Sequence, residues 1–414
     1  MLETLEQIGR AAKNAAALTA KLTTDEKNQM LNLCADGLVS QTERILDENS
    51  IDLELAKDVK DSFRDRLTLT ASRVQSMADG LKQIASLPDP VGEAIGMKTL
   101  ANGLIIAQKR VPMGVIAMIY EARPNVTADA FGLCFKAGNS VILRGGKEAI
   151  RSNMAIAGVL RDVLEKENYC PDIIQIITDT SREIAQGLMR LNKYVDLLIP
   201  RGGAGLIRSV VENSSIPVIE TGVGNCHIFV DESVSLSKAL PIIINAKTQR
   251  PGVCNAVEKL LIHESIAAEY LPVIAGALRE KGVEIRGDER AVSLIDNIKT
   301  ATEDDWHTEY ADLIIAIKVV SDIDEAMSHI KTYSSNHSDA ILTESYTNAQ
   351  RFLNEVDSAA VYVNASTRFT DGGEFGYGAE IGISTQKLHA RGPMGLRELT
   401  TTKYIIYGSG QIRE

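Results

Sequence analysis

The chain has 414 residues and carries 44 Lys and Arg against 55 Asp and Glu, so its formal net charge is −11 at pH 7. This negative balance argues against nucleic acid and against an anionic membrane surface as partners, because both would repel the protein. At ~150 residues per domain the length predicts two to three domains, and 44% hydrophobic with 24% charged residues is typical of a globular protein.

The cysteines and histidines predict a cytoplasmic protein without a metal site. The five cysteines are odd in number and lack a C-x-x-C pair, so neither disulfides nor a zinc site are expected. The six histidines form no H-x-x-H pair. Glu3 and Glu6 lie where a secretory signal would be basic and then apolar, and runs such as residues 111–120 are too short to span a bilayer.

The first part of the chain, up to the proline-rich break at residues 87–90, is predicted to be helical. Apolar residues at helical spacing indicate a first helix, residues 23–26 give a start signal for a second, and a third is expected from about residue 61 to residue 85. Asn102-Gly103 then predicts the turn of a hairpin, followed by a strand over residues 104–111.

From residue 114 onward, short apolar strands alternate with helices, which predicts buried parallel sheets. The first group of strands is expected at residues 114–120, 140–144, 173–178, 195–200 and 217–220, with a helix over 147–166. The second group is expected at residues 226–231, 257–263, 313–320 and 358–364, with helices at 236–247, 264–281 and 322–331. The final residues, 401–410, are predicted to form an exposed strand. The fold class is therefore α/β with doubly wound domains.

Two Arg-Gly-Gly turns each follow a predicted strand and precede a helix. They consist of Arg144, Gly145 and Gly146, followed by Lys147, and of Arg201, Gly202 and Gly203. A glycine turn lets backbone N–H groups approach a phosphate, with the N-terminus of a helix behind it. Neither turn is the G-x-G-x-x-G fingerprint, so a standard dinucleotide fold is not indicated, and solvated tight turns are the alternative.

Cys254 lies in an irregular turn after the helix break at Pro251-Gly252 and before a strand near Val257. A thiol in such a turn is exposed enough to react, and Arg250 or nearby backbone N–H groups would favour the thiolate nucleophile. The alternative is a small buried hydrophobe, which is the reading that fits the other four cysteines.

Polar residues at predicted strand ends are further candidates. Asn125 and Arg123 follow the strand over residues 114–120, at the edge of a parallel sheet where ligands bind. The Asn125 amide could donate to an oxyanion, and helix capping by Asn125 or Thr127 is the alternative. Glu220 could act as a general base or as a structural ion pair. Arg368, in the glycine-rich segment 365–384, suits a small anion unless this segment is only a surface loop.

Together these motifs resemble the aldehyde dehydrogenase superfamily, and within it most closely the reductases that act on an acyl phosphate of glutamate. The motifs that carry the resemblance extend from about residue 100 to residue 400 and are YEARPNVTADA, KAGNSVILRGGKEA, PRGGAGLI, PVIETGVGNCH, QRPGVCNA, AMSHIKTYSSNHSDAI and FGYGAEIGISTQKLHARGPMGL. The resemblance implies NADPH-dependent reduction of L-glutamyl 5-phosphate to L-glutamate 5-semialdehyde and phosphate, in proline biosynthesis, through a thioester.

The resemblance also implies roles for individual residues. Cys254 would be the nucleophile, and Asn125 with the Cys254 backbone N–H would form the oxyanion hole. The two Arg-Gly-Gly turns with Lys147 would hold the adenosine ribose and phosphates of NADPH, and Glu309 would hold the nicotinamide ribose. Glu220 matches the glutamate that activates hydrolytic water, a role that a reductase should not need. From their charge, Arg123 and Arg368 are assigned to the glutamyl carboxylate or the acyl phosphate.

The implied domains are an NADPH-binding domain (1–97 and 114–226), a catalytic domain (227–396) and an oligomerisation arm (98–113 and 397–414). A homo-oligomer is expected, and glutamate 5-kinase is the expected upstream partner because the acyl phosphate is labile. Two alternatives stay open. One is a hydrolytic NAD(P)-dependent aldehyde dehydrogenase, and the other is a cysteine acyltransferase or amidase, which would need His227 beside Cys254.

Overall fold

The computed structural model describes residues 2–57, 59 and 61–413, and the chain divides into two compact units. The first unit runs to Thr221 and also contains residues 376–382 and the chain from Met394 onward. The second unit consists of residues 222–375 and 383–393. The division therefore falls at Thr221, whereas the sequence placed it after residue 226, and the arm belongs to the first unit.

The N-terminal segment is helical, as predicted, but it contains more helices than expected. The helices are α1 (Leu2–Thr19), α2 (Thr24–Ser40), α3 (Thr42–Leu55), α4 (Asp61–Leu67) and α5 (Ala71–Ser86). Thr23 caps α2, because its side chain accepts the Glu26 backbone N–H while Glu26 Oε2 accepts the Thr23 backbone N–H at 2.7 Å. The single helix expected over residues 61–85 is wrong: Thr70 accepts the Arg73 N–H and starts a new helix.

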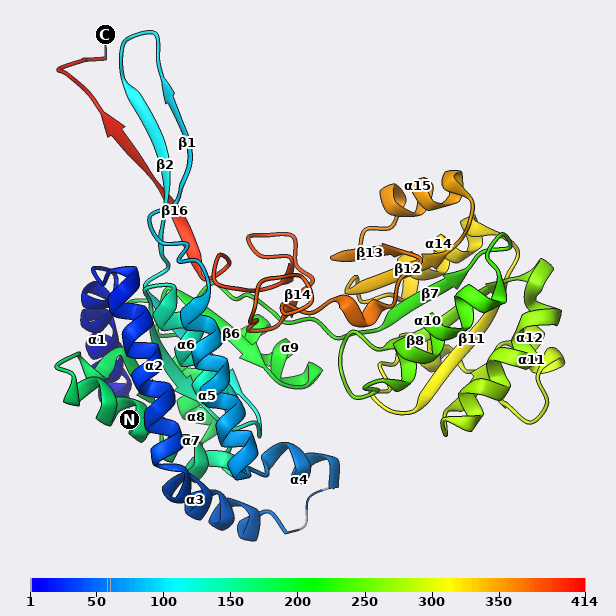
Figure 1. Ribbon diagram of the computed structural model, residues 1–414, viewed down its shortest axis with the longest axis horizontal. Helices are drawn as coiled ribbons and strands as arrows, with labels where there is room; N and C mark the ends of the chain where they lie inside the picture. Colours follow the sequence, from blue (N-terminus) through cyan, green and yellow to red (C-terminus); the bar gives the residue numbers. More distant parts are fainter. Residues whose placement is uncertain (1, 58, 60, 414) are drawn as a thin grey trace. The chain divides into compact units, whose positions relative to one another are not determined.

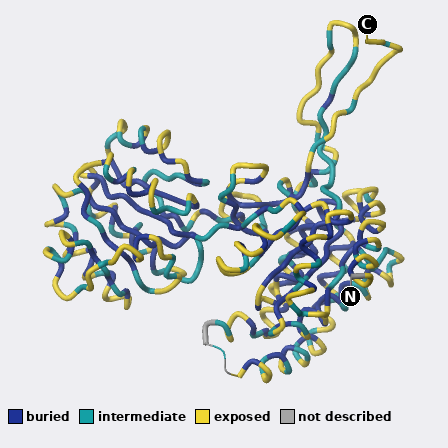
Figure 2. Tube along the Cα trace, turned by 180° about the vertical axis from the view of Figure 1, so that it is seen from behind, coloured by how far each residue is buried: buried dark blue, intermediate teal, exposed yellow. Residues whose placement is uncertain are grey.

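The first unit contains a parallel sheet whose three longer strands are largely buried (Figure 2). Its strands are β3 (Val115–Tyr120), β4 (Ser140–Arg144), β5 (Ile174–Ile176) and β6 (Leu197–Arg201), in the order β5-β4-β3-β6. The helical elements between and after them are α6 (Asn125–Lys136), η1 (Lys147–Ala149), α7 (Ile150–Lys166), η2 (Pro171–Ile173), α8 (Arg182–Met189) and α9 (Ala204–Asn213). The strand expected at 217–220 is wrong, since Val218 makes only an isolated bridge with Leu198.

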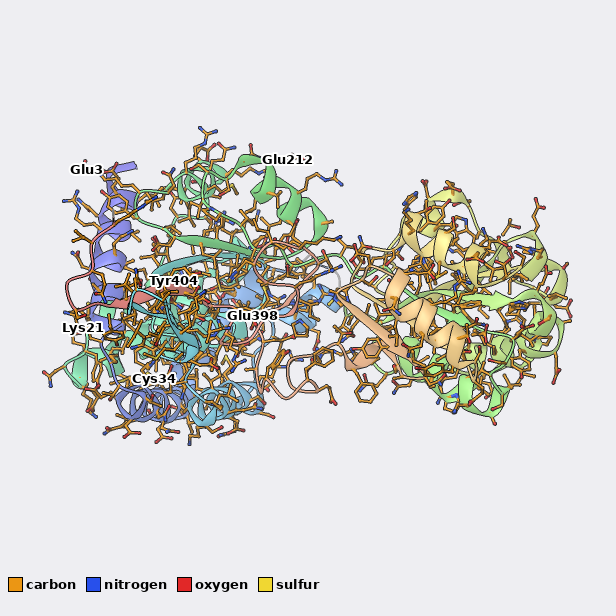
Figure 3. All side chains as sticks on the ribbon, turned by 90° about the horizontal axis from the view of Figure 1, so that it is seen from above. Glu3, Lys21, Cys34, Glu212, Glu398 and Tyr404 are labelled. Atoms are coloured by element: carbon orange, nitrogen blue, oxygen red, sulfur yellow. The ribbon has the colours of Figure 1, made fainter. Side chains whose placement is uncertain are left out.

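Helices cover this sheet and bury its side chains. One face of the sheet, with Val115, Ala117 and Ile119 of β3, packs with residues of α1, α8 and α9 in one apolar cluster. Figure 3 labels Cys34, which lies in α2 and is fully buried, so the interpretation of this cysteine as a small hydrophobe is confirmed.

An antiparallel ribbon projects from the first unit (Figure 1). It consists of β1 (Ala94–Thr99), β2 (Ile105–Pro112) and β16 (Thr400–Tyr407), with β2 in the middle. β16 pairs with β2 from Thr400 opposite Pro112 to Tyr407 opposite Ile105, so the predicted hairpin and terminal strand are both confirmed. The ribbon exposes several large apolar side chains, namely Ile95, Met97, Tyr404, Ile406 and Tyr407.

The second unit is built around a longer parallel sheet. Its strands are β7 (Cys226–Val230), β8 (Val257–His263), β9 (Glu284–Gly287), β10 (Lys299–Thr300), β11 (Ile314–Val320), β12 (Ser338–Leu342) and β13 (Ala360–Val363), in the order β10-β9-β11-β8-β7-β12-β13. Its helices are α10 (Leu236–Thr248), α11 (Glu264–Glu280), α12 (Glu289–Leu294), α13 (Glu303–His307), α14 (Ile323–Tyr333), α15 (Tyr346–Glu355) and η3 (Thr367–Phe369). A short ladder pairs β14 (Ile383–Ser384) with β15 (Gly392–Pro393).

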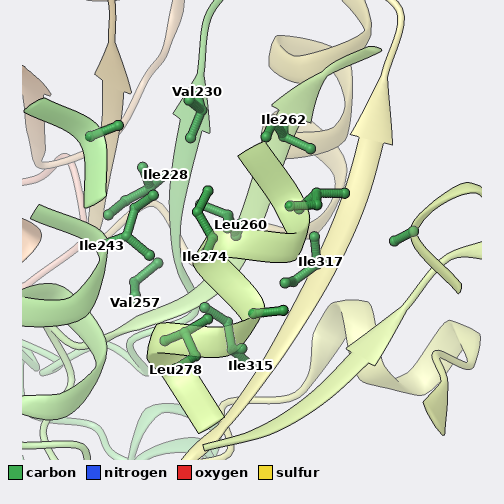
Figure 4. Packing of buried hydrophobic residues seen from close by; sticks show 14 of the residues in the cluster. Ile228, Val230, Ile243, Val257, Leu260, Ile262, Ile274, Leu278, Ile315 and Ile317 are labelled. Carbon is green, nitrogen blue, oxygen red and sulfur yellow. The ribbon is translucent and has the colours of Figure 1, made fainter. Parts of the chain in front are cut away.

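Neighbouring residues of each central strand pack on opposite faces of this sheet. Ile228 and Leu260 face the cluster of α10 and α11, where Ile243 and Ile274 are packed (Figure 4). Phe229 and Leu261 face the other cluster, which contains residues of α14 and α15. The predicted doubly wound arrangement is thus confirmed for this unit.

Within the described residues, no helix is long and apolar enough to cross a membrane. The same residues contain no group of three or more His, Cys, Asp or Glu side chains that could hold a metal ion.

Candidate active site

Cys254 lies in the turn between α10 and β8, and its side chain is half-buried. Because β8 runs parallel to its neighbours, this turn lies at the amino edge of the sheet. Three further polar or glycine positions precede strands at the same edge: Gly224 before β7, Glu309 before β11 and His337 before β12. The predicted irregular turn is confirmed.

The backbone of Cys254 packs tightly against the segment that precedes β7. A Cβ added to Gly224 would overlap the carbonyl group of Cys254, so only glycine fits at this position. The Cys226 thiol donates to the same carbonyl oxygen at 3.1 Å, and its sulfur lies 3.7 Å from His337 Nδ1. These contacts restrict the position of the peptide that carries Cys254.

Glu309 is connected to the same peptide segment. Its carboxylate accepts the backbone N–H of Gly224. Burial raises the pKa of Glu309, and this hydrogen bond together with Lys259 and Lys247 opposes the rise. Glu309 therefore lies in the second unit near the turn of Cys254.

A network of buried charged side chains lies within electrostatic reach of Glu309. Lys247 Nζ lies 3.0 Å from Glu258 Oε2, and both side chains are fully buried. Lys259 donates to the Thr308 carbonyl at 2.7 Å and lies 4.6 Å from the ring centre of Tyr310. Burial raises the pKa of Glu258 to about 7 and lowers that of Lys259 to about 7. The network fixes positive and negative groups in a region of low dielectric.

Arg368 is hydrogen-bonded to Asn255, the residue that follows Cys254. Its Nε donates to Gln249 Oε1 at 2.7 Å, and its Nη1 donates to Asn255 Oδ1. Burial lowers the pKa of Arg368, and Arg250 lowers it further, whereas the charges of Asp371, Cys254 and Glu374 raise it. The guanidinium is thus held by two neutral amides, and it lies within electrostatic reach of Cys254.

In the first unit, the two Arg-Gly-Gly turns follow β4 and β6, which flank β3 on either side. The chain passes from β3 to β4 on one side and returns with β6 on the other, so the carboxyl ends of these strands form a topological switch point. A Cβ at Gly145 would overlap the Asn153 side chain, and one at Gly202 would lie 2.7 Å from Glu121 Cδ. The absence of a Cβ at both glycines therefore lets the backbone pack closely against these neighbouring side chains.

The basic residues of these turns have different environments. Arg144 is half-buried, and its Nη2 donates to the carbonyls of Thr180 and Ser181, which precede α8. Lys147 is exposed, and the Arg201 guanidinium lies against Gly382. The turn after β6 offers the Gly203 N–H, which donates to Glu121 Oε2 at 3.1 Å in this structure.

Asn125 is the first residue of α6 and is exposed. Its Nδ2 donates to Asp129 Oδ2 at 2.9 Å, and burial raises the pKa of Asp129 to about 6. The capping alternative is wrong, because Pro124 is the cap and the Thr127 hydroxyl pairs with the Tyr120 hydroxyl at 2.7 Å. Asn125 and Cys254 belong to different units, so their joint oxyanion hole stays a prediction.

Arg123 and Glu220 also belong to the first unit. Arg123 is exposed on the turn after β3, and Glu220 is half-buried in the irregular segment that follows β6 and α9. Next to Glu220, the Thr221 hydroxyl donates to the Pro200 carbonyl at 3.1 Å. The imidazole of His227 is buried in β7, where its Nδ1 lies 2.9 Å from the Asn225 carbonyl oxygen. This environment does not favour His227 as a base for an amidase.

Sequence reasoning missed Asn255, Gln249, Gly224 and Cys226 as parts of the site. Asn255 and Gln249 flank the cysteine motif, but their partner Arg368 is 113 residues away from Asn255 in the sequence. A signal for Gly224 was present in the Thr-Gly-x-Gly motif, which was assigned only to Glu220.

Comparison with known proteins identifies the family. Residues 2–293 match the aldehyde dehydrogenase family. A gamma-glutamyl phosphate reductase of Lachnospira eligens is 57% identical over 100% of both chains, and one of Clostridium botulinum is 60% identical over 98% of both.

Solved structures agree with this relationship. The crystal structure of a gamma-glutamyl phosphate reductase from Thermotoga maritima is 52% identical, with a TM-score of 0.97 over 99% of this chain and 100% of that one. An acetylating aldehyde dehydrogenase from Geobacillus thermoglucosidasius shares the fold at 16% identity, with a TM-score of 0.72 over 100% of this chain and 98% of that one. The chain therefore belongs to the gamma-glutamyl phosphate reductase family, within the wider aldehyde dehydrogenase family.

Proposed function

We propose that this chain reduces L-glutamyl 5-phosphate to L-glutamate 5-semialdehyde and inorganic phosphate, with NADPH as the reductant, in proline biosynthesis. One structural observation carries the proposal within the second unit. The half-buried Cys254 lies on a turn, and the next residue, Asn255, accepts a hydrogen bond from Arg368. The side-chain acceptors of this arginine, on Asn255 and Gln249, are neutral amides and do not cancel its charge. A thiol nucleophile beside a cationic group suits an acyl substrate that carries an anionic leaving group.

The chemistry begins at Cys254. Its thiolate attacks the acyl carbonyl carbon, a carbon–sulfur bond forms, and the carbon–oxygen bond to phosphate breaks with the electron pair on the phosphate. The resulting thioester accepts a hydride far more readily than a carboxylate would, which is why a cysteine is needed. After reduction to the thiohemiacetal level, the carbon–sulfur bond breaks, the semialdehyde leaves and the thiolate is restored.

NADPH fits the chemistry of the first unit's glycine turns. We assign the adenosine ribose and phosphates to Arg144, Gly145, Gly146 and Lys147 and to the turn of Arg201, Gly202 and Gly203. The crowded Cβ positions at Gly145 and Gly202 and the switch point after β3 support this assignment. When bound, the cofactor supplies the hydride. An engineered glycolyl-CoA reductase of the same fold, 14% identical, is described with bound NADP+.

Four further residues complete the proposed site. Asn125 would stabilise the oxyanion together with the Cys254 N–H, and Glu309 would hold the nicotinamide ribose. Arg123 is proposed to bind the glutamyl carboxylate. Glu220 occupies the position of a hydrolytic base, but a reductase has no water to activate, so we assign it no proton transfer.

We further propose that the ribbon of β1, β2 and β16 is an oligomerisation arm of a cytoplasmic homo-oligomer. Its exposed apolar side chains support this role, because such a surface is costly to leave in water. Glutamate 5-kinase is the proposed upstream partner, since direct transfer would protect a labile acyl phosphate.

The reverse reaction separates this function from its rivals. With L-glutamate 5-semialdehyde and NADP+ but no phosphate, each site should form NADPH once and then stall, because no acceptor releases the thioester. Added phosphate or arsenate should restore turnover. A hydrolytic NAD(P)-dependent aldehyde dehydrogenase would turn over without phosphate, and a cysteine acyltransferase or amidase would form no NADPH, so either result would contradict the proposal.

A further inference from the structure

Asn255 uses its whole carboxamide to connect the nucleophile's turn to the segment around η3. Its Oδ1 accepts from Arg368 Nη1, and its Nδ2 donates to the Thr370 carbonyl at 2.9 Å and to the Arg368 carbonyl at 3.3 Å. Its own carbonyl accepts from Thr367 Oγ1 at 2.7 Å. Only 4% of Asn255 is exposed, so these bonds are made in a largely dry environment where they strongly restrict geometry.

Gln249 holds the same guanidinium from a second direction. It is the C-cap residue of α10, and its Oε1 accepts from Arg368 Nε at 2.7 Å. Two oxygen acceptors on different elements therefore fix the plane of the guanidinium. An arginine carries five N–H donors, so donors remain for a further acceptor, and neither amide contributes a negative charge.

We propose that Asn255 and Gln249 are positioning residues that hold Arg368 as a receptor for the phosphoryl group of the substrate beside Cys254. This inference rests on the proposed function. The phosphoryl group is the relevant anion because it is bonded to the carbonyl that the cysteine attacks, whereas the carboxylate of the substrate lies at its far end. Arg368 is hydrogen-bonded to Asn255, the residue after Cys254, and we therefore place it at the end of the substrate that reacts.

There is a physical reason why the two residues that accept hydrogen bonds from Arg368 are amides. A carboxylate at residue 255 would form an ion pair with Arg368 and compete with the phosphoryl group for its donors. A side chain without an acceptor would leave a long, flexible arginine, which would lose more conformational freedom on binding the anion. A neutral amide fixes the guanidinium and leaves its charge available.

The reverse reaction tests this proposal through the KM for inorganic phosphate, at saturating semialdehyde and NADP+. Removing one charge-assisted contact or its support should raise this KM roughly tenfold for Asn255→Ala and Gln249→Ala, and more for Arg368→Gln. Asn255→Asp should raise it more than Asn255→Ala, although Asp is nearly isosteric. The KM for NADP+ should stay within about threefold of that of the unchanged protein, because Asn255, Gln249 and Arg368 are not among the residues assigned to the cofactor.

A matched control and a double variant separate positioning from a general loss of structure. Asn354 is exposed on α15 and donates to the Gln350 carbonyl, so Asn354→Ala should leave the KM for phosphate unchanged. The double variant with Asn255→Ala and Arg368→Gln should match Arg368→Gln alone, because the amide acts through the arginine. Gln249 is exposed, so Gln249→Ala carries the test even if Asn255→Ala does not fold.

The outcomes distinguish this inference from the proposed function. If turnover saturates with phosphate, but Asn255→Ala and Gln249→Ala keep the KM of the unchanged protein, the positioning role is overturned and the function stands. Multiplicative effects in the double variant would also overturn it, since they would show that Asn255 acts independently of Arg368. Turnover without any phosphate would instead overturn the proposed function itself.

Discussion

Gly224 and Cys254 are in direct backbone contact, because the Cα of Gly224 packs against the carbonyl group of Cys254. Gly224 does not have a positive φ, so the requirement for glycine comes from space and not from backbone conformation. The segment that leads into the strand beginning at Cys226 thus supports the peptide of Cys254, the proposed nucleophile. Any displacement of this support moves the sulfur relative to its substrate.

Replacing Gly224 by alanine should therefore lower kcat by roughly 10²-fold, since displacements of about 1 Å have effects of this size. The added Cβ would push the Cys254 carbonyl away. Gly276→Ala is the matched control, because a Cβ on this exposed residue of α11 meets nothing within 4 Å. Steady-state rates and thermal unfolding of both variants check this. Retention of full activity by Gly224→Ala would mean that the contact does not control the nucleophile.

Cys226 should matter for catalysis although it is not a nucleophile. Its thiol donates to the Cys254 carbonyl, so Cys226→Ala should lower kcat by roughly fivefold, which corresponds to about 1 kcal/mol for one hydrogen bond. Cys226→Ser keeps a donor and should recover part of the loss. Cys34→Ala, at a buried cysteine of the first unit, should lower stability and leave kcat unchanged. Equal rates for Cys226→Ala and the unchanged protein would assign Cys226 to packing alone.

The cofactor assignment is tested best at Lys147, which is exposed, and less well at Arg144, which also holds the carbonyls of Thr180 and Ser181. Lys147→Ala should weaken NADPH by roughly tenfold or more and NADH far less, because a charge-assisted contact to a phosphate contributes ~1.5–3 kcal/mol. Fluorescence titration with both cofactors measures this. Equal weakening of NADPH and NADH would place Lys147 away from the 2′-phosphate.

The sequence predicted elements well where local pattern decides. The strands at 140–144 and 257–263 were predicted with the observed bounds, because each contains a run of β-branched and other large apolar residues. β12 was not predicted, because it begins with the polar residues Ser338 and Asp339, whose buried side chains are satisfied in part by partners far away in the sequence. Asp339, for example, accepts from Ser358 Oγ and from the His227 backbone N–H.

The candidate site shows the same division between local and distant information. Cys254 could be selected because a helix break, glycine and cysteine are adjacent in the sequence. The contacts of Asn255 with Arg368 and of Gly224 with Cys254 join segments that only the fold brings together. Ligands of parallel sheets are expected at the carboxyl edge, yet this cysteine, which follows a helix and precedes a strand, lies at the amino edge of its sheet.

Buried histidines should make the protein sensitive to acid. Burial lowers the pKa of His329 from 6.5 to about 2, and His227 contributes repulsion. Both ring nitrogens of His329 lack a partner among the described residues, while its ring lies 4.5 Å from that of Tyr333. A lowered pKa means that the unfolded chain binds the proton first, so the stabilisation is present above pH 6.5 and is lost as the pH falls below it.

His329→Phe keeps the ring contact and removes the proton site. One such histidine should lower the free energy of unfolding of the unchanged protein by about 2 kcal/mol between pH 8 and pH 5. The free energy of unfolding of His329→Phe should fall by correspondingly less over the same range. Urea unfolding at both pH values measures the difference. The exposed His389→Phe serves as the control and should keep the acid sensitivity of the unchanged protein. An identical acid response in His329→Phe would assign the sensitivity to other groups.

The covalent step is the central claim, and the mass of the trapped protein tests it most directly. The protein is mixed with L-glutamate 5-semialdehyde and NADP+ without phosphate, quenched in acid and analysed as the intact chain and as peptides. The account predicts one glutamyl group per chain, attached to the peptide that contains Cys254, and its loss when phosphate is added before quenching. A glutamyl group on another cysteine, or NADPH formation with no covalent adduct, would contradict the thioester mechanism.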